Sequence, residues 1–198
     1  MTRATDRRAF LLGAALAALG AHRALTPLSA RAESDVLALL AEPRTHAIMR
    51  HALAPGTSDP AHFELGNCST QRNLDDRGRA QARATGALLR ESGVRFDRVL
   101  SSRWCRCLET ARLMDLGAVE GAPPLDSFFE ARHRRAEQTA ALHAILRATP
   151  AADTLLLVTH QVNITALTGR GTSSGEIVVF RHGEADAVTV LGRTVLRP

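Results

Sequence analysis

The 198-residue sequence contains no lysine and no tyrosine, and aromatic residues make up only 4% of it. All 25 strongly basic side chains are therefore arginines, which stay charged at a pH where lysines would be neutral. This composition raises the isoelectric point without implying a nucleic-acid partner. Five arginines and one acid lie in the first 32 residues, so residues 33–198 carry 20 arginines and 19 acids, a net charge of +1. That balance excludes an overall basic field for DNA or for a membrane.

The chain also lacks internal repeats and low-complexity linkers, and beyond its N-terminal segment it has no long apolar run. A chain of this length can bury one core but is too short for two domains of ordinary size. We therefore expect one domain with one site, and no stable membrane span once the N-terminal segment is removed.

The N-terminus has the organisation of an export signal. Arg7-Arg8 precedes an apolar run from Ala9 to Leu19, and Ala30-Arg31-Ala32 offers a small-x-small cleavage site. The paired arginines resemble those of a twin-arginine signal, although Asp6 stands where serine or threonine is usual. The apolar run is short of the roughly 20 residues that span a bilayer, which favours a cleaved signal over a retained anchor. We expect residues 33–198 to be exported, to the periplasm or beyond.

Segments with strand-like and helix-like patterns alternate along the rest of the chain. Apolar runs predict strands at 45–49, 96–100 and 154–158, and helical spacing predicts helices at 33–43, 77–92, 102–114 and 136–148. Asp75 or Asp76 can cap the second helix, and Ser101 or Ser102 the third. The last segment indicates two strands, 176–180 and 187–196, around a turn at Gly183. This alternation predicts an α/β fold, a three-layer α/β/α sandwich with a mostly parallel central sheet.

Basic side chains follow three of the predicted parallel strands. Arg50 and His51 come after the first strand, Arg106 after the second and His160 after the third. In an open α/β sheet, ligands bind beyond the carboxyl ends of the strands. Guanidinium groups match phosphate oxygens in pairs. The sequence therefore predicts a pocket for a phosphoryl group at this edge of the sheet.

Four motifs, in order and spacing, resemble those of the histidine phosphatase superfamily, the phosphoglycerate mutase-like fold. They are Arg50-His51-Ala52, where the family has glycine third, Leu74 to Ala82 at the start of a helix, Ser101-Ser102 with Arg106, Thr110 and Ala111, and Val158-Thr159-His160. The resemblance implies that His51 is the nucleophile and becomes transiently phosphorylated. It also implies that Arg50, Arg106 and His160 bind the phosphoryl group, and that no metal or other cofactor takes part.

The acid that protonates the leaving alcohol is the residue that the sequence determines least. The family draws it from the segment after the third strand, where Ser127 stands at the position of the usual carboxylate. We favour Glu130 for this role. Asp126 from nearby, and Asp59 or Glu64 from the first loop, are the alternatives.

Three cysteines lie in two segments that border the proposed pocket. An exported protein enters an oxidising compartment, which permits a disulfide. We predict that Cys68 pairs with Cys105 or Cys107, and the alternative is three free thiols packed as small apolar groups. A zinc site is disfavoured because no second Cys or His pair has suitable spacing.

A second Arg-His-Gly motif occurs at Arg181-His182-Gly183-Glu184 and matches the family's opening motif better than Arg50-His51-Ala52 does. It comes after the late histidine strand, and its continuation is typical of a hairpin turn. No helix or arginine element follows that could complete a pocket, so we assign the site to His51.

The resemblance implies a metal-independent phosphatase that hydrolyses a phosphate monoester. Residues 67–74 and 104–107 are similar to a subgroup that includes lipopolysaccharide core heptose phosphatases, which implies a sugar phosphate or an envelope lipid phosphate as substrate. A mutase is disfavoured because the chain lacks the long insertions that hold a second phosphate. The competing hypothesis is a non-catalytic phosphate-binding protein on the same fold. Four arginines are expected to form a solvated face, with guidance of an anionic substrate as the alternative: Arg103, Arg132, Arg134 and Arg135.

Overall fold

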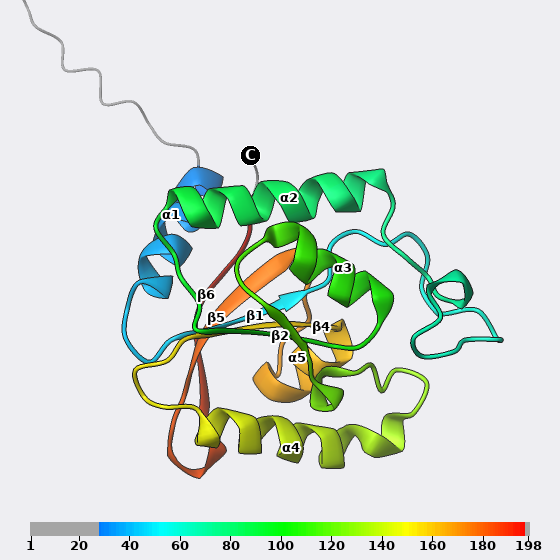
Figure 1. Cartoon of the computed structure of the whole chain (residues 1–198). Coiled ribbons are helices and arrows are strands. Elements are labelled where there is room, and N and C mark those ends of the chain that lie inside the picture. Colours follow the sequence, from blue (N-terminus) through cyan, green and yellow to red (C-terminus); the bar gives the residue numbers. More distant parts are fainter. Residues whose placement is uncertain (1–27, 197–198) are drawn as a thin grey trace, which may run out of the picture.

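A computed structural model describes residues 28–196 and places a six-stranded sheet between two layers of helices (Figure 1). The strands are β1 (His46–Arg50), β2 (Arg98–Ser101), β3 (Val119–Gly121), β4 (Leu155–Thr159), β5 (Glu176–His182) and β6 (Val188–Val195). Their order in the sheet is β3-β2-β4-β1-β5-β6. The first four strands in that order are parallel, and β5 and β6 are antiparallel additions at one edge. The predicted three-layer α/β fold with a mostly parallel sheet is confirmed.

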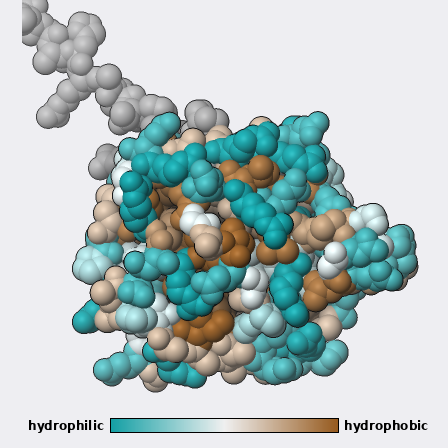
Figure 2. All heavy atoms as spheres, viewed as in Figure 1, coloured by the Kyte–Doolittle hydropathy of each residue, from teal (hydrophilic) through white to brown (hydrophobic). Residues whose placement is uncertain are grey.

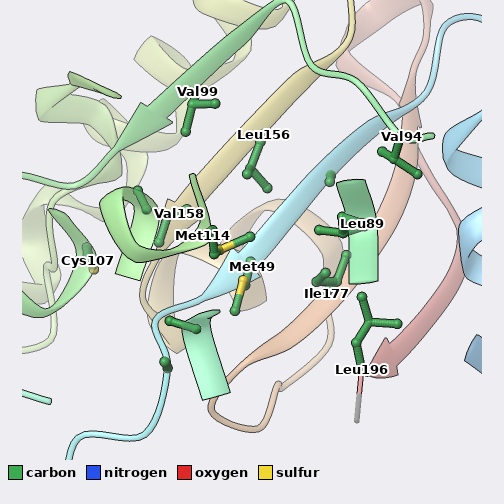
Figure 3. Packing of buried hydrophobic residues seen from close by; sticks show 14 of the residues in the cluster. Met49, Leu89, Val94, Val99, Cys107, Met114, Leu156, Val158, Ile177 and Leu196 are labelled. Atoms are coloured by element: carbon green, nitrogen blue, oxygen red, sulfur yellow. The ribbon is translucent and has the colours of Figure 1, made fainter. Parts of the chain in front are cut away.

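The two helical layers pack against opposite faces of this sheet. One layer contains α1 (Leu28–Leu40), α2 (Asp76–Glu91) and α3 (Cys105–Met114), and the other contains α4 (Arg135–Ala148) and α5 (Gln161–Thr168). Successive side chains of a strand point to opposite faces, so Met49 of β1 packs in the first layer and Ile48 in the second. Figure 3 shows Met49 close to Leu89 of α2 and Met114 of α3. Burial on both faces explains why the central residues of β1, β2 and β4 are apolar.

Glycines let α2 approach its neighbours closely. A Cβ on Gly78 would lie 1.9 Å from the carbonyl oxygen of Leu53, and one on Gly86 would lie 1.9 Å from that of Met114. The side chain of Asp75 caps the helix by accepting a hydrogen bond from the Gly78 N–H, as one of the two predicted caps. The start of α2 is therefore fixed against the loop that follows His51.

Some elements differ from the sequence predictions. Neither β3 nor α5 follows from the apolar patterns, because both are short. The predicted cap of α3 is wrong: the helix begins at Cys105, and Trp104 occupies the N-cap position without a side-chain cap. Ser102 lies two residues earlier and uses its hydroxyl in the site described below.

Most of the predicted export signal lies outside the described residues. The proposed cleavage motif at 30–32 falls inside α1, which begins at Leu28. Among residues 28–196, no helix combines the length and apolar character needed to cross a membrane. On the face shown in Figure 2, apolar side chains are interspersed with hydrophilic ones.

Candidate active site

The site lies at the carboxyl ends of β1, β2 and β4. Arg50 ends β1 and His51 follows it, while His160 follows β4. The backbone N–H of His51 donates to the carbonyl of Thr159 across these strands at 2.9 Å. The pairing brings the two imidazole rings together edge to face, with centroids 5.6 Å apart. Arg106 enters from the first turn of α3, and all four predicted residues line one pocket.

His51 is held in one tautomer. Its Nδ1 lies 2.7 Å from the backbone carbonyl of Ala52, which can only accept, so Nδ1 carries the proton and Nε2 keeps its lone pair. The side chain is only 1% exposed. Burial, followed by the charges of Arg106 and Arg50, lowers the pKa of His51 to about 3. His51 is therefore neutral near pH 7, which is the form that can attack phosphorus.

His160 is oriented by a chain of polar contacts. Arg106 Nη2 lies 3.4 Å from His160 Nδ1, which must then accept, so the proton resides on Nε2. Nε2 donates to the Ser102 hydroxyl at 2.8 Å, and that hydroxyl lies 3.4 Å from Asp126 Oδ1. Burial, and after it the charge of Arg106, keeps the pKa of His160 well below its usual value. The pocket thus contains two neutral histidines.

Three arginines converge on the site. Arg50, Arg72 and Arg106 each have a buried Nε that finds no hydrogen-bond partner among residues 28–196. A buried donor without a partner costs about 1–3 kcal/mol. Burial and the charge of Arg106 lower the pKa of both Arg50 and Arg72, the latter to about 10. Unpaired donors and mutual repulsion both favour the binding of an oxyanion between these side chains.

Arg72 is the pocket residue that the sequence reasoning missed. Its guanidinium donates to the carbonyl of Ala54, and its backbone N–H donates to Asp59 Oδ1 at 3.0 Å. It lies near the end of the long first loop, two residues before the helix signature that begins at Leu74. The first loop begins at the site after His51 and ends at the helix signature. A basic residue next to that signature could therefore have been predicted to lie at the site.

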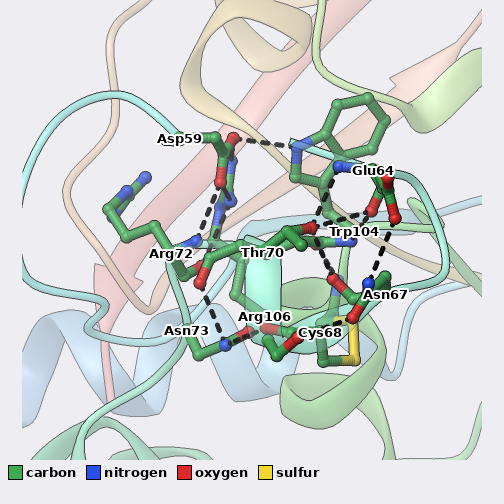
Figure 4. Close-up of a disulfide and its surroundings, with 12 residues drawn as sticks. Asp59, Glu64, Asn67, Cys68, Thr70, Arg72, Asn73, Trp104 and Arg106 are labelled. Carbon is green, nitrogen blue, oxygen red and sulfur yellow. Dashed lines mark hydrogen bonds and ion pairs between the residues drawn. A yellow bond between two sulfur atoms is a disulfide. The ribbon is translucent and has the colours of Figure 1, made fainter. Parts of the chain in front are cut away.

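Asp59 forms a two-point ion pair with Arg106. Its Oδ1 lies 2.7 Å from Arg106 Nη1 and its Oδ2 lies 3.1 Å from Nη2 (Figure 4). Oδ2 also accepts from Trp104 Nε1 at 3.0 Å. Burial alone would raise the pKa of Asp59, but its contacts with Arg106 lower it overall. Asp59 is therefore an ionised carboxylate that fixes the orientation of Arg106.

The four candidate acids have different environments. Asp126 is buried and accepts hydrogen bonds from the backbone and side chain of Arg103. Glu64 accepts from Asn67 in the first loop and does not line the pocket. Asp59 and Glu130 do line it. Glu130 is exposed and makes no ion pair or side-chain hydrogen bond within the described part of the chain.

A disulfide joins Cys68 to Cys105, with the Cα atoms 5.7 Å apart, and Cys107 is a buried free thiol. This is one of the two predicted pairings. The bond connects the first loop to the residue before Arg106 (Figure 4). Burial raises the pKa of Cys107 to about 12, so this thiol stays protonated. The disulfide tethers the loop that carries Asp59 and Arg72 to the helix that carries Arg106.

The second Arg-His-Gly motif lies away from this pocket. Arg181 pairs with Glu42, and His182 Nε2 lies 3.1 Å from His143 Nδ1 of α4. These histidines and Asp186 form the one group within residues 28–196 whose ligand atoms are close enough to hold a metal ion. Asp186 also pairs with Arg147. None of them lines the pocket.

Comparison with protein families gives a partial match. The model of the histidine phosphatase superfamily (branch 1) matches residues 47–123. The mitochondrial serine/threonine-protein phosphatase Pgam5 of Drosophila virilis is 34% identical over 85 residues, which are 42% of this chain and 27% of the relative. The chain therefore spans about a quarter of the length of this relative.

Solved structures share the fold along most of the chain. A mycobacterial glucosyl-3-phosphoglycerate phosphatase in complex with VO3 has a TM-score of 0.58 at 15% identity, covering 78% of this chain and 100% of that one. The protein histidine phosphatase SixA in complex with tungstate has a TM-score of 0.55 at 18% identity, covering 76% and 96%. At these identities the likeness shows the fold. The family model thus matches residues 47–123, and the likeness to these solved structures shows the fold over 76% and 78% of the chain.

Proposed function

We propose that this protein is an exported, metal-independent phosphatase that hydrolyses a phosphate monoester through a phosphohistidine on His51. The observation that carries the proposal is a neutral His51 whose Nδ1 carries the proton, in a pocket with three arginines whose Nε groups find no partner in the described part of the chain. Two structural neighbours are complexes with the oxyanions tungstate and VO3, the class of ligand that these arginines would bind.

In the first proposed step, Nε2 of His51 attacks phosphorus while the bond to the ester oxygen breaks. Arg50 and Arg106 stabilise the negative charge on the phosphoryl oxygens, and the Arg72 guanidinium adds to the same field. The leaving oxygen takes a proton from an acid, for which we propose Glu130 because it lines the pocket and no cation among residues 28–196 pairs with it. Asp59 is less suited, since its contacts with Arg106 lower its pKa.

In the second proposed step, water attacks the phosphorus of the phosphohistidine. The Glu130 carboxylate accepts the water proton, the P–N bond breaks, and its electron pair returns to Nε2 of His51. Inorganic phosphate leaves and His51 is neutral again. His160 stays neutral throughout and contacts the phosphoryl group, held in place by Ser102.

Turnover of an aryl phosphate in the presence of a chelator tests this function. We expect the wild-type protein to release the phenol without added metal, and His51→Ala to lose at least about a thousandfold in kcat. His62→Ala replaces an exposed histidine that does not line the pocket and should keep full activity. Absent turnover together with intact phosphate binding would favour the competing phosphate-binding function.

Export is proposed from the sequence of the first 32 residues, and a disulfide is compatible with an oxidising compartment. Cell fractionation of the full chain and of a variant with Arg7→Lys and Arg8→Lys tests it. We expect the wild type in the exported fraction with Glu33 as its first residue, and the variant retained inside. Recovery of both proteins inside the cell would contradict export. A sugar phosphate or lipid phosphate of the cell envelope is the substrate that this location favours.

A further inference from the structure

We propose that the natural substrate carries a second anionic group on its leaving group, and that Arg132, Arg134 and Arg135 bind that group at the rim of the pocket. The inference rests on the proposed function and names the class of substrate for the same site. Three observations support it: positive charge is concentrated at the pocket, the three rim arginines have no acidic partners in the described residues, and the pocket is large and partly aromatic.

Positive charge is concentrated at the pocket. Six arginines line it, Arg50, Arg72, Arg106, Arg132, Arg134 and Arg135, with two carboxylates, Asp59 and Glu130, a formal charge of +4. Residues 33–198 as a whole carry 20 arginines and 19 acids, so the rest of this segment has 14 arginines and 17 acids and a charge of −3. A cationic pocket on a slightly acidic protein selects anionic ligands. The excess is larger than the charge of a single phosphate monoester, which is close to −2 at neutral pH.

The three rim arginines have no acidic partners within residues 28–196. They lie at neighbouring positions, in a 3-10 turn at Arg132–Arg134 and at the first residue of α4, and all are exposed. Some exposed arginines elsewhere, such as Arg147 and Arg181, pair with acids. Single unpaired arginines are common on surfaces, but adjacent ones on one pocket wall repel each other. An anion between them removes that repulsion.

Aromatic side chains line the same pocket as this rim and the two histidines. Phe63 stacks on Trp104 with centroids 4.9 Å apart, and Trp104 meets His160 edge-on at 5.5 Å. Phe129 is 36% exposed, and the Arg132 guanidinium lies 5.3 Å from its ring centroid. The pocket volume of about 1150 Å³ is far more than one phosphate occupies. This space fits a leaving group with an apolar or ring-shaped part that reaches from His51 to the rim.

Two aryl phosphates that differ only in a distal charge test the inference. One carries a carboxymethyl group on the ring and the other its amide, so that the reactivity of the ester bond is matched. We expect the wild type to prefer the carboxylate by about tenfold in kcat/KM, from several exposed ion pairs together. Replacement of all three rim arginines with glutamine should bring the ratio of the two kcat/KM values close to one.

A matched control removes three arginines elsewhere. Arg77, Arg83 and Arg112 are exposed on α2 and α3, make no ion pair in the described part of the chain and do not line the pocket. Their glutamine variant should keep the preference. An equal loss of preference in this control, or a wild-type ratio near one, would overturn the inference.

The corresponding phosphonates keep the two questions separate. Their affinities are measured by calorimetry, which needs no turnover. If neither ester is hydrolysed, the proposed function fails, but tighter binding of the carboxymethyl phosphonate, lost in the rim variant, still supports the second anion site. If both esters are hydrolysed and both phosphonates bind equally, the function stands and the inference is wrong.

Discussion

Asp59 and Arg106 lie 47 residues apart in sequence and form a two-point ion pair. Arg106 Nη1 lies 2.7 Å from Asp59 Oδ1, and Nη2 lies 3.1 Å from Oδ2. Arg106 contacts His160 from the same guanidinium group. The first loop therefore controls the position of a phosphate-binding arginine that α3 supplies. An ion pair with so little exposure is expected to matter for both stability and function.

Asp59→Asn should reduce stability at pH 7, because it leaves Arg106 buried without its counter-charge. The folded-state pKa of Asp59 is lowered, so its contribution is present above the ordinary carboxyl pKa of about 4 and is lost as the pH falls through the lower folded value. The difference in unfolding free energy between wild type and variant should therefore shrink below about pH 4. Urea unfolding from pH 7 to pH 3 measures it. A difference that stays constant over this range would contradict the ion pair.

The disulfide Cys68–Cys105 should stabilise the fold, since it closes a loop of 37 residues in the unfolded chain. In a chain-entropy description this contributes about 3–4 kcal/mol. Reductant should lower Tm of the wild type and reduce kcat/KM, because Asp59 and Arg72 lose their tether to α3. The double variant Cys68→Ala with Cys105→Ala should resemble the reduced wild type and show no response to reductant. A wild type whose Tm and activity ignore reductant would be inconsistent with this role.

Glu130→Gln should slow the hydrolysis of alkyl phosphates by about a hundredfold, because their alkoxide leaving groups need a proton. Nitrophenyl phosphate should be affected little, since nitrophenolate leaves without one. Steady-state kinetics with both esters separates these cases, and Glu64→Gln is the matched control outside the pocket. Equal effects on the two esters would remove Glu130 from the acid role, and the same comparison with Asp59→Asn would then decide for or against Asp59.

The low pKa of His51 makes stability fall on acidification. An unfolded histidine takes up a proton near pH 6.5, whereas folded His51 does so near 3. Between these values the unfolded state binds more protons, so the free energy of unfolding decreases as the pH falls, by about 1.4 kcal/mol per pH unit. Chemical unfolding at pH 7 and pH 5 should show a loss about 2 kcal/mol larger in the wild type than in His51→Gln. Parallel pH dependences would contradict a buried neutral His51.

The site residues that could be predicted from the sequence are those that strands and helices hold in place. Arg50, His51 and His160 follow apolar strands, and the shared edge of a parallel sheet brings such residues together. Arg72 and Asp59 belong to a loop without periodicity, so only tertiary contacts determine their place. At Ser102 the local sequence predicts the wrong role. Local propensity predicts a helix cap, but the hydroxyl forms a hydrogen bond with His160, because a buried imidazole needs a partner.

The short elements β3 and α5 could not be predicted from the sequence either. The three residues of β3 and the eight of α5 offer too few positions for a periodic pattern. Pairing with β2 fixes β3, and packing of Ile164 and Leu167 against the sheet fixes α5. Both elements depend on neighbours that are distant in sequence.

Mass spectrometry of enzyme quenched within milliseconds of mixing with an aryl phosphate tests the central claim most directly. The account predicts one acid-labile phosphoryl group per chain, located on His51 and absent from His51→Ala. A turning-over wild-type enzyme that carries no phosphoryl group at any time, or carries it on another residue, would contradict it.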